Sequence, residues 1–225
     1  MRVCAAPPFA EDAPRVDETR WRAHDLLRVA RLAPSEDEPE WVRDALACAP
    51  WLVVRRARAA SGFVAAGVRG SVRAQRFGAW VNTEDIELSL SPEDLLTVEP
   101  LKERLALPAL AALAALREAA SPLHDYVWGP TGSTGFELAT GAPTLTASSD
   151  LDILIRLPYR IEREAIDALA HAFAQAASRA GTRIDAQLET PSGGVALAEL
   201  AAHKPRVLAR ASSGAQLVTD PWRTP

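Results

Sequence analysis

The stretch Ser149-Asp150-Leu151-Asp152-Ile153-Leu154-Ile155 carries the pattern that decides the fold. Alternate positions of a β-strand share one face, so Asp150 and Asp152 project together while the apolar residues between and after them pack behind. Two neighbouring carboxylates that enter a buried strand are costly unless a partner or a cation neutralises them. Magnesium is commonly held by one or two carboxylates together with substrate phosphate oxygens. The stretch therefore predicts a buried strand that carries a pair of metal-binding carboxylates.

A second acidic strand follows at Ile184-Asp185-Ala186-Gln187-Leu188-Glu189. The same alternation places Asp185, Gln187 and Glu189 on one face and the apolar side chains on the other. Asp185 is then available as a third carboxylate, which would complete a two-metal site for phosphoryl transfer.

A glycine-rich segment, Trp128-Gly129-Pro130-Thr131-Gly132-Ser133, precedes both strands. Glycine lets the backbone approach a ligand closely, and the N–H groups at the start of a helix bind phosphate oxygens. Gly132 and Ser133 are therefore the candidate phosphate-binding residues. The segment has neither the Lys-Ser/Thr pair of a P-loop nor the G-x-G-x-x-G spacing of a dinucleotide site, which excludes kinase-type and Rossmann interpretations.

Each feature is weak alone, because an Asp-x-Asp pair is typical of a solvated strand end and Gly-Ser is typical of a turn. In the order glycine loop, Asp-x-Asp strand, long helix and acidic strand, they resemble the nucleotidyltransferase fold of the DNA polymerase β superfamily. The resemblance implies that Ser133 belongs to the glycine-serine signature. It also implies that Asp150 and Asp152 are paired metal ligands and that Asp185 is the third carboxylate. The spacer at 134–149 is longer than in most members.

Around these motifs, hydrophobic periodicity and turn residues predict alternating helices and strands, which indicate an α+β fold with a mixed sheet covered by helices. Helices are expected at 39–48, 136–139, 162–180 and 195–201, and a further helix has Pro108 in its first turn and ends before Ser121. Strands are expected at 51–56, 63–69, 123–128, 151–157, 183–190, 207–211 and 216–218, and a loop at 129–135. Three parts are expected: an extension at 1–20, a small α+β domain at 21–100 and a nucleotidyltransferase-like domain at 101–225.

Composition excludes several classes of protein. With 48% hydrophobic and 24% charged residues, the 225-residue chain is typical of a soluble globular protein. The N-terminal residues 1–18 contain prolines and acids where a signal peptide needs an apolar core, and no apolar run reaches the roughly 20 residues of a membrane helix. Two cysteines, Cys4 and Cys48, exclude a disulfide framework and favour the cytoplasm. A net charge of −4 argues against nucleic acid as a partner.

The basic residues are not evenly distributed along the chain. Residues 45–83 contain no acid, but they contain Arg55, Arg56, Arg58, Arg69, Arg73 and Arg76. Arg69 and Arg73 are the better candidates for substrate binding, because nearby glycines place them beside a loop that can approach a ligand. The nucleotide donor or an acidic carrier protein would suit this segment, and the sequence does not choose between them. A solvated face is the alternative for each single arginine.

A closer resemblance covers nearly everything after residue 20. It is carried by HDLL (24–27), PWLVVRR (50–56), GVRG (67–70), AQRFGAW (74–80), WGPTGSTGFELATG (128–141), TASSDLDILIR (146–156), IDAQLETPSGG (184–194) and DPW (220–222). These runs resemble the malonate decarboxylase holo-acyl-carrier-protein synthases, the phosphoribosyl-dephospho-CoA transferases. The resemblance implies transfer of the prosthetic group from triphosphoribosyl-dephospho-CoA to a serine of the apo acyl carrier protein subunit of malonate decarboxylase, with release of pyrophosphate.

The expected mechanism assigns a role to each motif. Mg²⁺ held by Asp150 and Asp152 would bind the triphosphate, and Gly132-Ser133 would bind the leaving pyrophosphate. Asp185 would bind a second ion or accept the proton of the attacking hydroxyl. The alternatives are a nucleotidyltransferase that uses ATP or another NTP on a different protein or small-molecule hydroxyl, and a non-catalytic binding module. The presence of all three carboxylates counts against the binding module.

Overall fold

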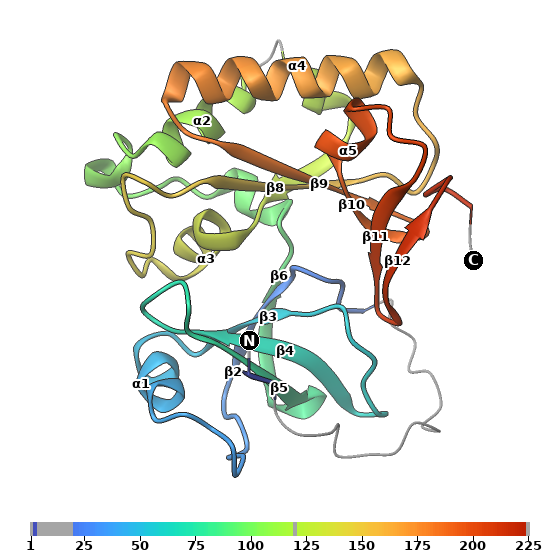
Figure 1. Ribbon diagram of the computed structural model, residues 1–225. Helices are drawn as coiled ribbons and strands as arrows, with labels where there is room; N and C mark the ends of the chain where they lie inside the picture. The colour runs from blue at the N-terminus through green and yellow to red at the C-terminus, as the bar shows by residue number, and fades with distance from the viewer. Residues whose placement is uncertain (1, 4–19, 119–120, 224–225) are drawn as a thin grey trace. The chain divides into compact units, whose positions relative to one another are not determined.

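The computed structural model describes residues 2–3, 20–118 and 121–223 (Figure 1). Most of the extension expected at residues 1–20 therefore lies outside the described residues. Contacts divide the chain into two compact units, one that ends at Ser91 (unit 1) and one that begins at Pro92 (unit 2). The sequence places the corresponding boundary at residue 100.

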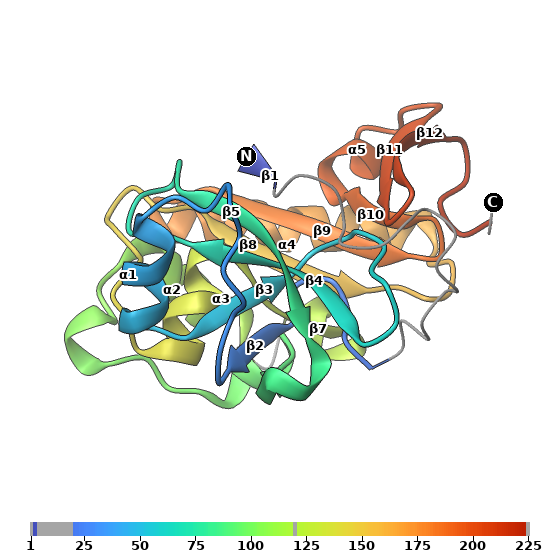
Figure 2. The ribbon, with the colours of Figure 1, turned by 90° about the horizontal axis from the view of Figure 1, so that it is seen from below.

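Unit 1 is built on a six-stranded sheet in the order β1-β5-β4-β3-β2-β6, which is antiparallel except for the parallel pair β1 and β5. Figure 2 shows β3, β4 and β5 side by side, with α1 next to them. The elements are β1 (Arg2–Val3), β2 (Leu26–Val29), α1 (Trp41–Cys48), β3 (Trp51–Val54), β4 (Phe63–Arg69), β5 (Arg76–Asn82), the 3-10 helix η1 (Thr83–Asp85) and β6 (Ile86–Leu90).

One face of this sheet forms the core of unit 1. Leu27, Leu52 and Val68 point to this face from three different strands, and all three are almost completely buried. Helix α1 covers this face through Val42, which has no exposed surface. The alternate positions, on the opposite face, carry buried apolar residues such as Leu26 and Trp51 as well as arginines such as Arg28 and Arg69.

Unit 2 contains a second six-stranded sheet, in the order β12-β11-β10-β9-β8-β7. Only the pair β8 and β9 is parallel, because the long helix between them returns the chain to the same end of the sheet. The strands are β7 (Val127–Pro130), β8 (Leu151–Arg156), β9 (Ile184–Thr190), β10 (Gly193–Ala196), β11 (Val207–Ala211) and β12 (Gly214–Val218).

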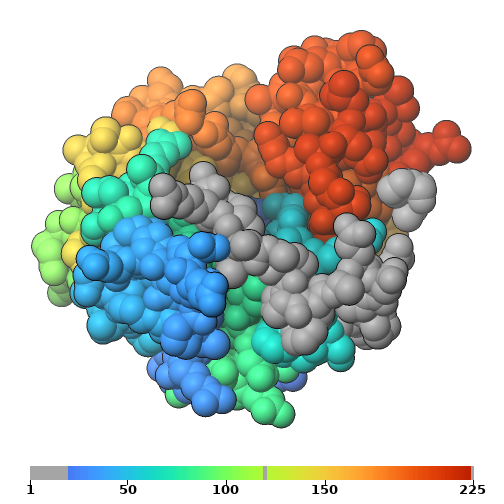
Figure 3. All heavy atoms as spheres, turned by 60° about the horizontal axis from the view of Figure 1, so that its bottom comes forward, coloured from blue at the N-terminus to red at the C-terminus, as the bar shows by residue number. Residues whose placement is uncertain are grey.

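Helices lie on both sides of the strands of unit 2. Figure 1 shows α2 and α4 together on one side of β8 and β9 and α3 on the other. Helix α5 and the β11–β12 hairpin form the red lobe in Figure 3. The helices are α2 (Pro108–Leu116), α3 (Gly132–Thr140), α4 (Arg163–Ala180) and α5 (Leu197–Ala201), with the 3-10 helices η2 (Asp94–Thr97), η3 (Lys102–Arg104) and η4 (Pro122–Asp125).

The architecture confirms the predicted α+β class, and it corrects several elements. The strand expected at 123–128 is the 3-10 helix η4 followed by β7, because Pro122 occupies a first-turn position that suits a helix. The loop expected at 129–135 is shorter, since β7 reaches Pro130 and α3 begins at Gly132. Strand β10 replaces the start of the helix expected at 195–201. No helix of the described residues has the length and hydropathy to cross a membrane.

Candidate active site

The pairing of β8 with β9 brings the predicted acids to one face of the sheet. In the parallel register Asp152 lies opposite Asp185, and the amide of Leu151 donates to the carbonyl of Arg183 at 2.9 Å. Asp150 and Arg183 precede these two acids by two residues each, so alternation directs their side chains to the same face. The parallel register therefore places the carboxylates of Asp150, Asp152 and Asp185 on one face of the sheet of unit 2, which we call the acidic face.

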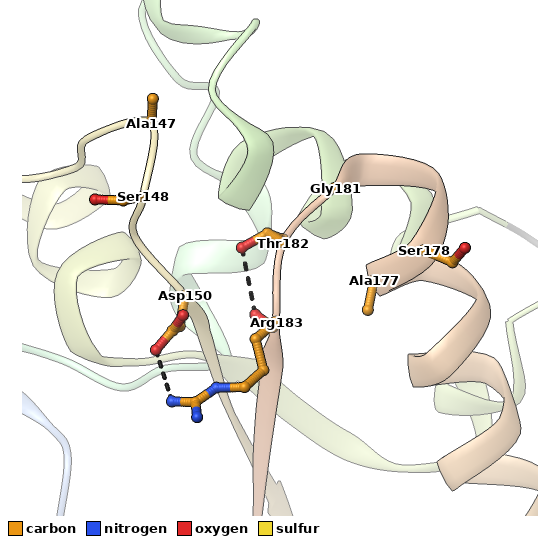
Figure 4. A pocket seen from close by; sticks show the side chains of 8 residues that line it. All are labelled: Ala147, Ser148, Asp150, Ala177, Ser178, Gly181, Thr182 and Arg183. Carbon is orange, nitrogen blue, oxygen red and sulfur yellow. Dashed lines mark hydrogen bonds and ion pairs between the residues drawn. The ribbon is translucent and has the colours of Figure 1, made fainter.

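A guanidinium lies between two of these carboxylates. Nη2 of Arg183 is 2.7 Å from an oxygen of Asp150 and 2.7 Å from an oxygen of Asp185. Figure 4 shows the arginine pointing from β9 toward Asp150. The charge of Asp185 and then the hydrogen bond and charge of Asp150 raise the pKa of Arg183 above its ordinary value. Sequence reasoning missed Arg183, although its position two residues before Asp185 places it on the acidic face.

The acids also determine what kind of ion could bind. Carboxylate oxygens are the ligands that Mg²⁺ prefers, and the guanidinium between Asp150 and Asp185 shows that a cation fits there. Among the described residues, no group of three or more His, Cys, Asp or Glu side chains is arranged to hold a metal ion. The donor set fits magnesium in chemistry, and Arg183 bridges two of the three acids in this arrangement.

The start of α3 lies directly against Asp152. Gly132, the first residue of this helix, has φ +59°, and a Cβ on it would overlap Oδ2 of Asp152 and lie 2.8 Å from its Cγ. The amide of Thr131 donates to the carbonyl of Asp152 at 2.8 Å. Glycine is therefore required at position 132 by its backbone angle and by the close approach of a carboxylate.

Ser133 follows Gly132 in the first turn of α3 and is half-buried. Its carbonyl accepts a hydrogen bond from the hydroxyl of Thr144 at 3.0 Å. The next residue, Thr134, has no exposed surface, and its hydroxyl has no hydrogen-bond partner among the described residues. The two predicted phosphate-binding residues thus begin a helix whose first N–H groups lie beside the acidic face.

An ion pair that the sequence did not reveal holds the spacer after α3. Arg104 donates to Glu137 at 2.8 Å and 3.0 Å, and the amides of Thr144 and Leu145 donate to the same carboxylate at 2.7 Å. Burial alone would raise the pKa of Glu137, but the hydrogen bonds from Arg104, Leu145 and Thr144 outweigh it and lower the pKa below the ordinary value. No spacing pattern signals this pair, because its partners are distant in sequence.

An open pocket adjoins the acidic face, with a volume of about 480 Å³ (Figure 4). It lies between the loop that precedes β8 and the turn from α4 to β9. Its lining is mostly small and polar and includes Ser148, Asp150, Ser178, Thr182 and Arg183. The space beside Asp150 is therefore large enough for a phosphate-bearing group.

The two arginines singled out in the sequence occupy different surroundings in unit 1. Arg69 is the last residue of β4 and is half-buried, whereas Arg73 is exposed in the loop between β4 and β5. Arg76, at the start of β5, lies opposite Arg69 in the antiparallel register. The acid-free segment thus contributes arginines to a sheet as well as to a loop.

Comparison with known proteins covers both units. A family model described as the phosphoribosyl-dephospho-CoA transferase MdcG C-terminal domain matches residues 89–221, and the model of the corresponding N-terminal domain matches residues 22–92. No solved structure matches the chain significantly.

Curated relatives match nearly the whole chain. The phosphoribosyl-dephospho-CoA transferase of Pseudomonas aeruginosa is 45% identical over 205 residues, which cover 89% of this chain and 93% of the relative. The enzyme of the same name from Pseudomonas putida W619 is 42% identical over 88% of this chain and 94% of the relative, and that of Azotobacter vinelandii is 43% identical over 82% and 86%. The chain therefore belongs to the MdcG family of phosphoribosyl-dephospho-CoA transferases and is a transferase enzyme.

Proposed function

We propose that this enzyme transfers the phosphoribosyl-dephospho-CoA group from its triphosphate precursor to a serine hydroxyl of the apo acyl carrier protein subunit of malonate decarboxylase, and that pyrophosphate leaves. Membership of the family establishes a transferase, and the proposal adds the identity of the donor, of the acceptor and of the leaving group. It places the reaction in the cytoplasm, where composition and the two cysteines favour the enzyme.

The observation that carries the proposal is the juxtaposition of the acidic face with the start of α3. The register of β8 and β9 aligns Asp152 with Asp185, and Gly132 lies against Asp152. A phosphate group at this position would meet helix N–H donors on one side and cation-binding carboxylates on the other. This pairing suits a polyphosphate substrate, and it is the arrangement expected of a DNA polymerase β-like nucleotidyltransferase.

In the proposed reaction the serine oxygen of the carrier attacks the α-phosphorus of the triphosphate. The new P–O bond forms a phosphodiester, and the bond from the α-phosphorus to the oxygen that bridges it to the β-phosphorus breaks. Pyrophosphate takes that bridging oxygen and its electron pair. The carboxylate of Asp185 accepts the serine proton or binds an ion, while Gly132 and Ser133 bind the leaving pyrophosphate.

Asp150 and Asp152 are the proposed ligands of Mg²⁺, with Asp185 as the third. When bound, the ion would supply charge neutralisation on the phosphate oxygens. The chain itself orients the donor and positions the acceptor hydroxyl, and such positioning is the main protein contribution to phosphoryl transfer. Arg183 would have to release Asp150 or Asp185 before all three acids could bind one group.

The deciding experiment incubates the purified enzyme with the apo carrier subunit, the triphosphoribosyl donor and Mg²⁺. Mass spectrometry is expected to show the carrier heavier by one phosphoribosyl-dephospho-CoA unit, with an equal amount of pyrophosphate released. Asp150→Asn and Asp152→Asn are expected to abolish the transfer and to leave the thermal transition unchanged. Near wild-type turnover by either variant would contradict the assignment of these ligands.

A parallel incubation replaces the donor with ATP. The proposal predicts no modification of the carrier and no release of pyrophosphate in that reaction. Release of pyrophosphate from ATP without the carrier subunit would instead identify a nucleotidyltransferase that acts on another hydroxyl.

A further inference from the structure

The pocket beside Asp150 and the start of α3 border different carboxylates of the acidic face. The lining of the pocket includes Asp150 and Arg183 but not Asp152. At the start of α3, the three atoms nearest to a Cβ on Gly132 all belong to Asp152. Asp150 immediately precedes β8, and Asp152 is the second residue of that strand. The pocket therefore borders the first carboxylate of the pair, and the start of α3 borders the second.

This arrangement suits the geometry of phosphoryl transfer. The attacking and leaving oxygens lie roughly in line, on opposite sides of the phosphorus. In the proposed function, pyrophosphate leaves toward Gly132 and Ser133, which begin α3. The attacking hydroxyl must then come from the side away from α3. The pocket borders the acid pair at Asp150, where such a hydroxyl can enter.

Arg183 marks the position that an entering hydroxyl would reach. It lines the pocket, and its Nη2 is 2.7 Å from an oxygen of Asp150 and 2.7 Å from an oxygen of Asp185. A polar atom that takes the place of this nitrogen is within hydrogen-bond reach of both carboxylates. One proposed role of Asp185 is to accept the proton of the attacking serine. A serine hydroxyl that enters through the pocket would therefore meet this carboxylate.

Hydrogen bonds hold the two walls of the pocket in place. The hydroxyl of Thr182 donates to the carbonyl of Ser149 at 2.9 Å, which joins the turn from α4 to β9 to the loop that precedes β8. Within that loop the amide of Thr146 donates to the hydroxyl of Ser149 at 2.9 Å, and the hydroxyls of Thr146 and Ser148 lie 3.1 Å apart. A site whose walls are already ordered loses little conformational entropy when a ligand binds.

The charge of the lining favours a polypeptide over a phosphate group. One wall is the last turn of α4, with Ala177 and Ser178, and Gly181 is the C-cap of that helix. A helix C-terminus carries partial negative charge, and Asp150 adds a carboxylate, so both attract hydrogen-bond donors and repel phosphate oxygens. Arg183 is the one cation among the described residues of the lining, and it is paired with two acids. The pocket could admit a phosphate by size, but its charge suits N–H and O–H groups.

The side chains of the lining leave room for a protein loop. Figure 4 shows Ser148 and Ser178 on opposite sides of Thr182, and both serines are exposed. Apart from Asp150 and Arg183, the described lining consists of Ala, Gly, Ser and Thr residues. Small side chains on exposed walls let the backbone of another folded protein come close. A small-molecule donor needs no such access.

We propose that this pocket binds the serine-bearing segment of the acyl carrier protein. The inference rests on the proposed function, which names the carrier and its serine but no surface that receives them. Ser148 and Ser178 would contact the residues beside that serine, and its hydroxyl would reach Asp150 and Asp185. All four residues belong to unit 2. The triphosphate of the donor then lies on the other side of the acid pair, toward α3.

The test narrows the pocket from each wall without changing a charge. Ser178→Trp and Ser148→Trp each place a large side chain in it. Both are expected to raise the KM for the apo carrier subunit about tenfold or more, because the segment no longer fits, and to leave the KM for the triphosphoribosyl donor unchanged. Ser213→Trp is the matched control, because it adds the same side chain to the exposed turn between β11 and β12. The thermal transition of each variant verifies that unit 2 is folded.

Three outcomes would overturn the inference. The first is an unchanged KM for the carrier in both pocket variants. The second is a raised KM for the donor with an unchanged KM for the carrier, which would assign the pocket to the ribose of the donor. The third is an equal increase of the carrier KM in Ser213→Trp and Ser178→Trp, which would show that the position of the tryptophan does not matter.

A binding measurement separates this inference from the proposed function. The full-length enzyme is titrated calorimetrically with the apo carrier subunit, without donor or Mg²⁺, and Ser178→Trp is expected to bind the carrier about tenfold more weakly than the wild type. That weakening in an enzyme that never modifies the carrier would support the pocket and contradict the proposed transfer. Transfer by the wild type, with equal carrier affinity in Ser148→Trp, Ser178→Trp and Ser213→Trp, would contradict the pocket alone.

Discussion

Arg183 is the residue that most changes the interpretation of the acidic face. Its guanidinium contacts Asp150 and Asp185, so two of the three proposed metal ligands have a cation between them already. All three side chains keep solvent contact, with 63% of Arg183 exposed, so the bridge is not fixed by burial. Exposed ion pairs contribute little stability, and Arg183 can therefore leave at a small cost.

Arg183→Gln is expected to increase the affinity for Mg²⁺, because it removes the cation that competes for the same carboxylates. The measurement is a calorimetric titration of the free enzyme with Mg²⁺, which does not depend on turnover. Arg179→Gln is the control, since it removes an exposed arginine from the last turn of α4. An unchanged affinity for Mg²⁺ in Arg183→Gln would show that the guanidinium does not occupy the metal position.

At the scale of elements, the start of α3 depends on one glycine. Gly132 combines a positive φ with close approach to Asp152, while Gly141 at the other end of the same helix has φ +70° and open space around it. The two positions share the backbone requirement and differ in the carboxylate. Alanine substitutions at Gly132 and Gly141 therefore distinguish the effect of backbone strain, which both variants have, from the effect of displacing Asp152, which only the substitution at position 132 has.

Gly132→Ala is expected to abolish transfer, because the new Cβ must push the carboxylate of Asp152 away from the helix. Gly141→Ala should lose only about 1–2 kcal/mol of stability from the left-handed backbone and keep its activity. Steady-state kinetics and the free energy of unfolding in urea measure the two effects. If both variants lost activity in proportion to their stability, contact with Asp152 would not be the cause.

The ion pair between Arg104 and Glu137 makes the spacer after α3 sensitive to acid. The pKa of Glu137 is lowered in the folded protein from an ordinary value of 4.5, so the carboxylate stabilises the fold above pH 4.5. This stabilisation is lost as the pH falls through the lowered pKa, because the unfolded chain then binds more protons. Urea unfolding from neutral pH to below 4.5 is expected to show this loss.

Glu137→Gln provides the comparison for that pH dependence. The variant keeps the size of the side chain but removes the charge that faces Arg104, and it should be about 1–3 kcal/mol less stable at neutral pH. Its stability should also fall less steeply in acid than that of the wild type. Parallel pH profiles of the two proteins would assign the acid sensitivity to other carboxylates.

At the scale of the whole molecule, residues 92–100 decide where the second unit begins. Leu95 in η2 is 1% exposed, and Glu93 forms an ion pair at 2.8 Å with Arg156, whose side chain is largely buried. A Cβ on Gly129 would overlap the carbonyl of Pro92, so this segment lies directly against β7. The segment thus fills part of the core of unit 2.

A fragment that begins at Pro92 is expected to unfold cooperatively, whereas one that begins at residue 101 should be destabilised by several kcal/mol. Loss of a buried leucine costs about 2–5 kcal/mol, and loss of Glu93 leaves the charge of Arg156 buried without that partner. Urea denaturation of the two fragments measures the difference. Equal stability would favour the boundary at residue 100 that the sequence predicts.

The sequence by itself determined the elements that carry the reactive groups. The alternation of Asp150 to Ile155 predicted β8, and the long apolar periodicity at 162–180 predicted α4, because both patterns are local and strong. Gly132 and Ser133 were identifiable from glycine chemistry. Strands such as β2 and β6 were not predicted, since short strands owe their conformation to neighbours that pair with them.

The tertiary structure alone decided which of these groups meet. The register of β8 with β9 aligns Asp152 with Asp185, and the register of β4 with β5 pairs Arg69 with Arg76. Register is set by the hydrogen bonds between paired strands together with the burial of one face and the connection between the strands, so the residue pattern of a single strand does not specify it. For the same reason the bridge of Arg183 and the position of Arg55 near Trp80 emerged only from the fold, whereas the chemical identity of each side chain is a property of the sequence.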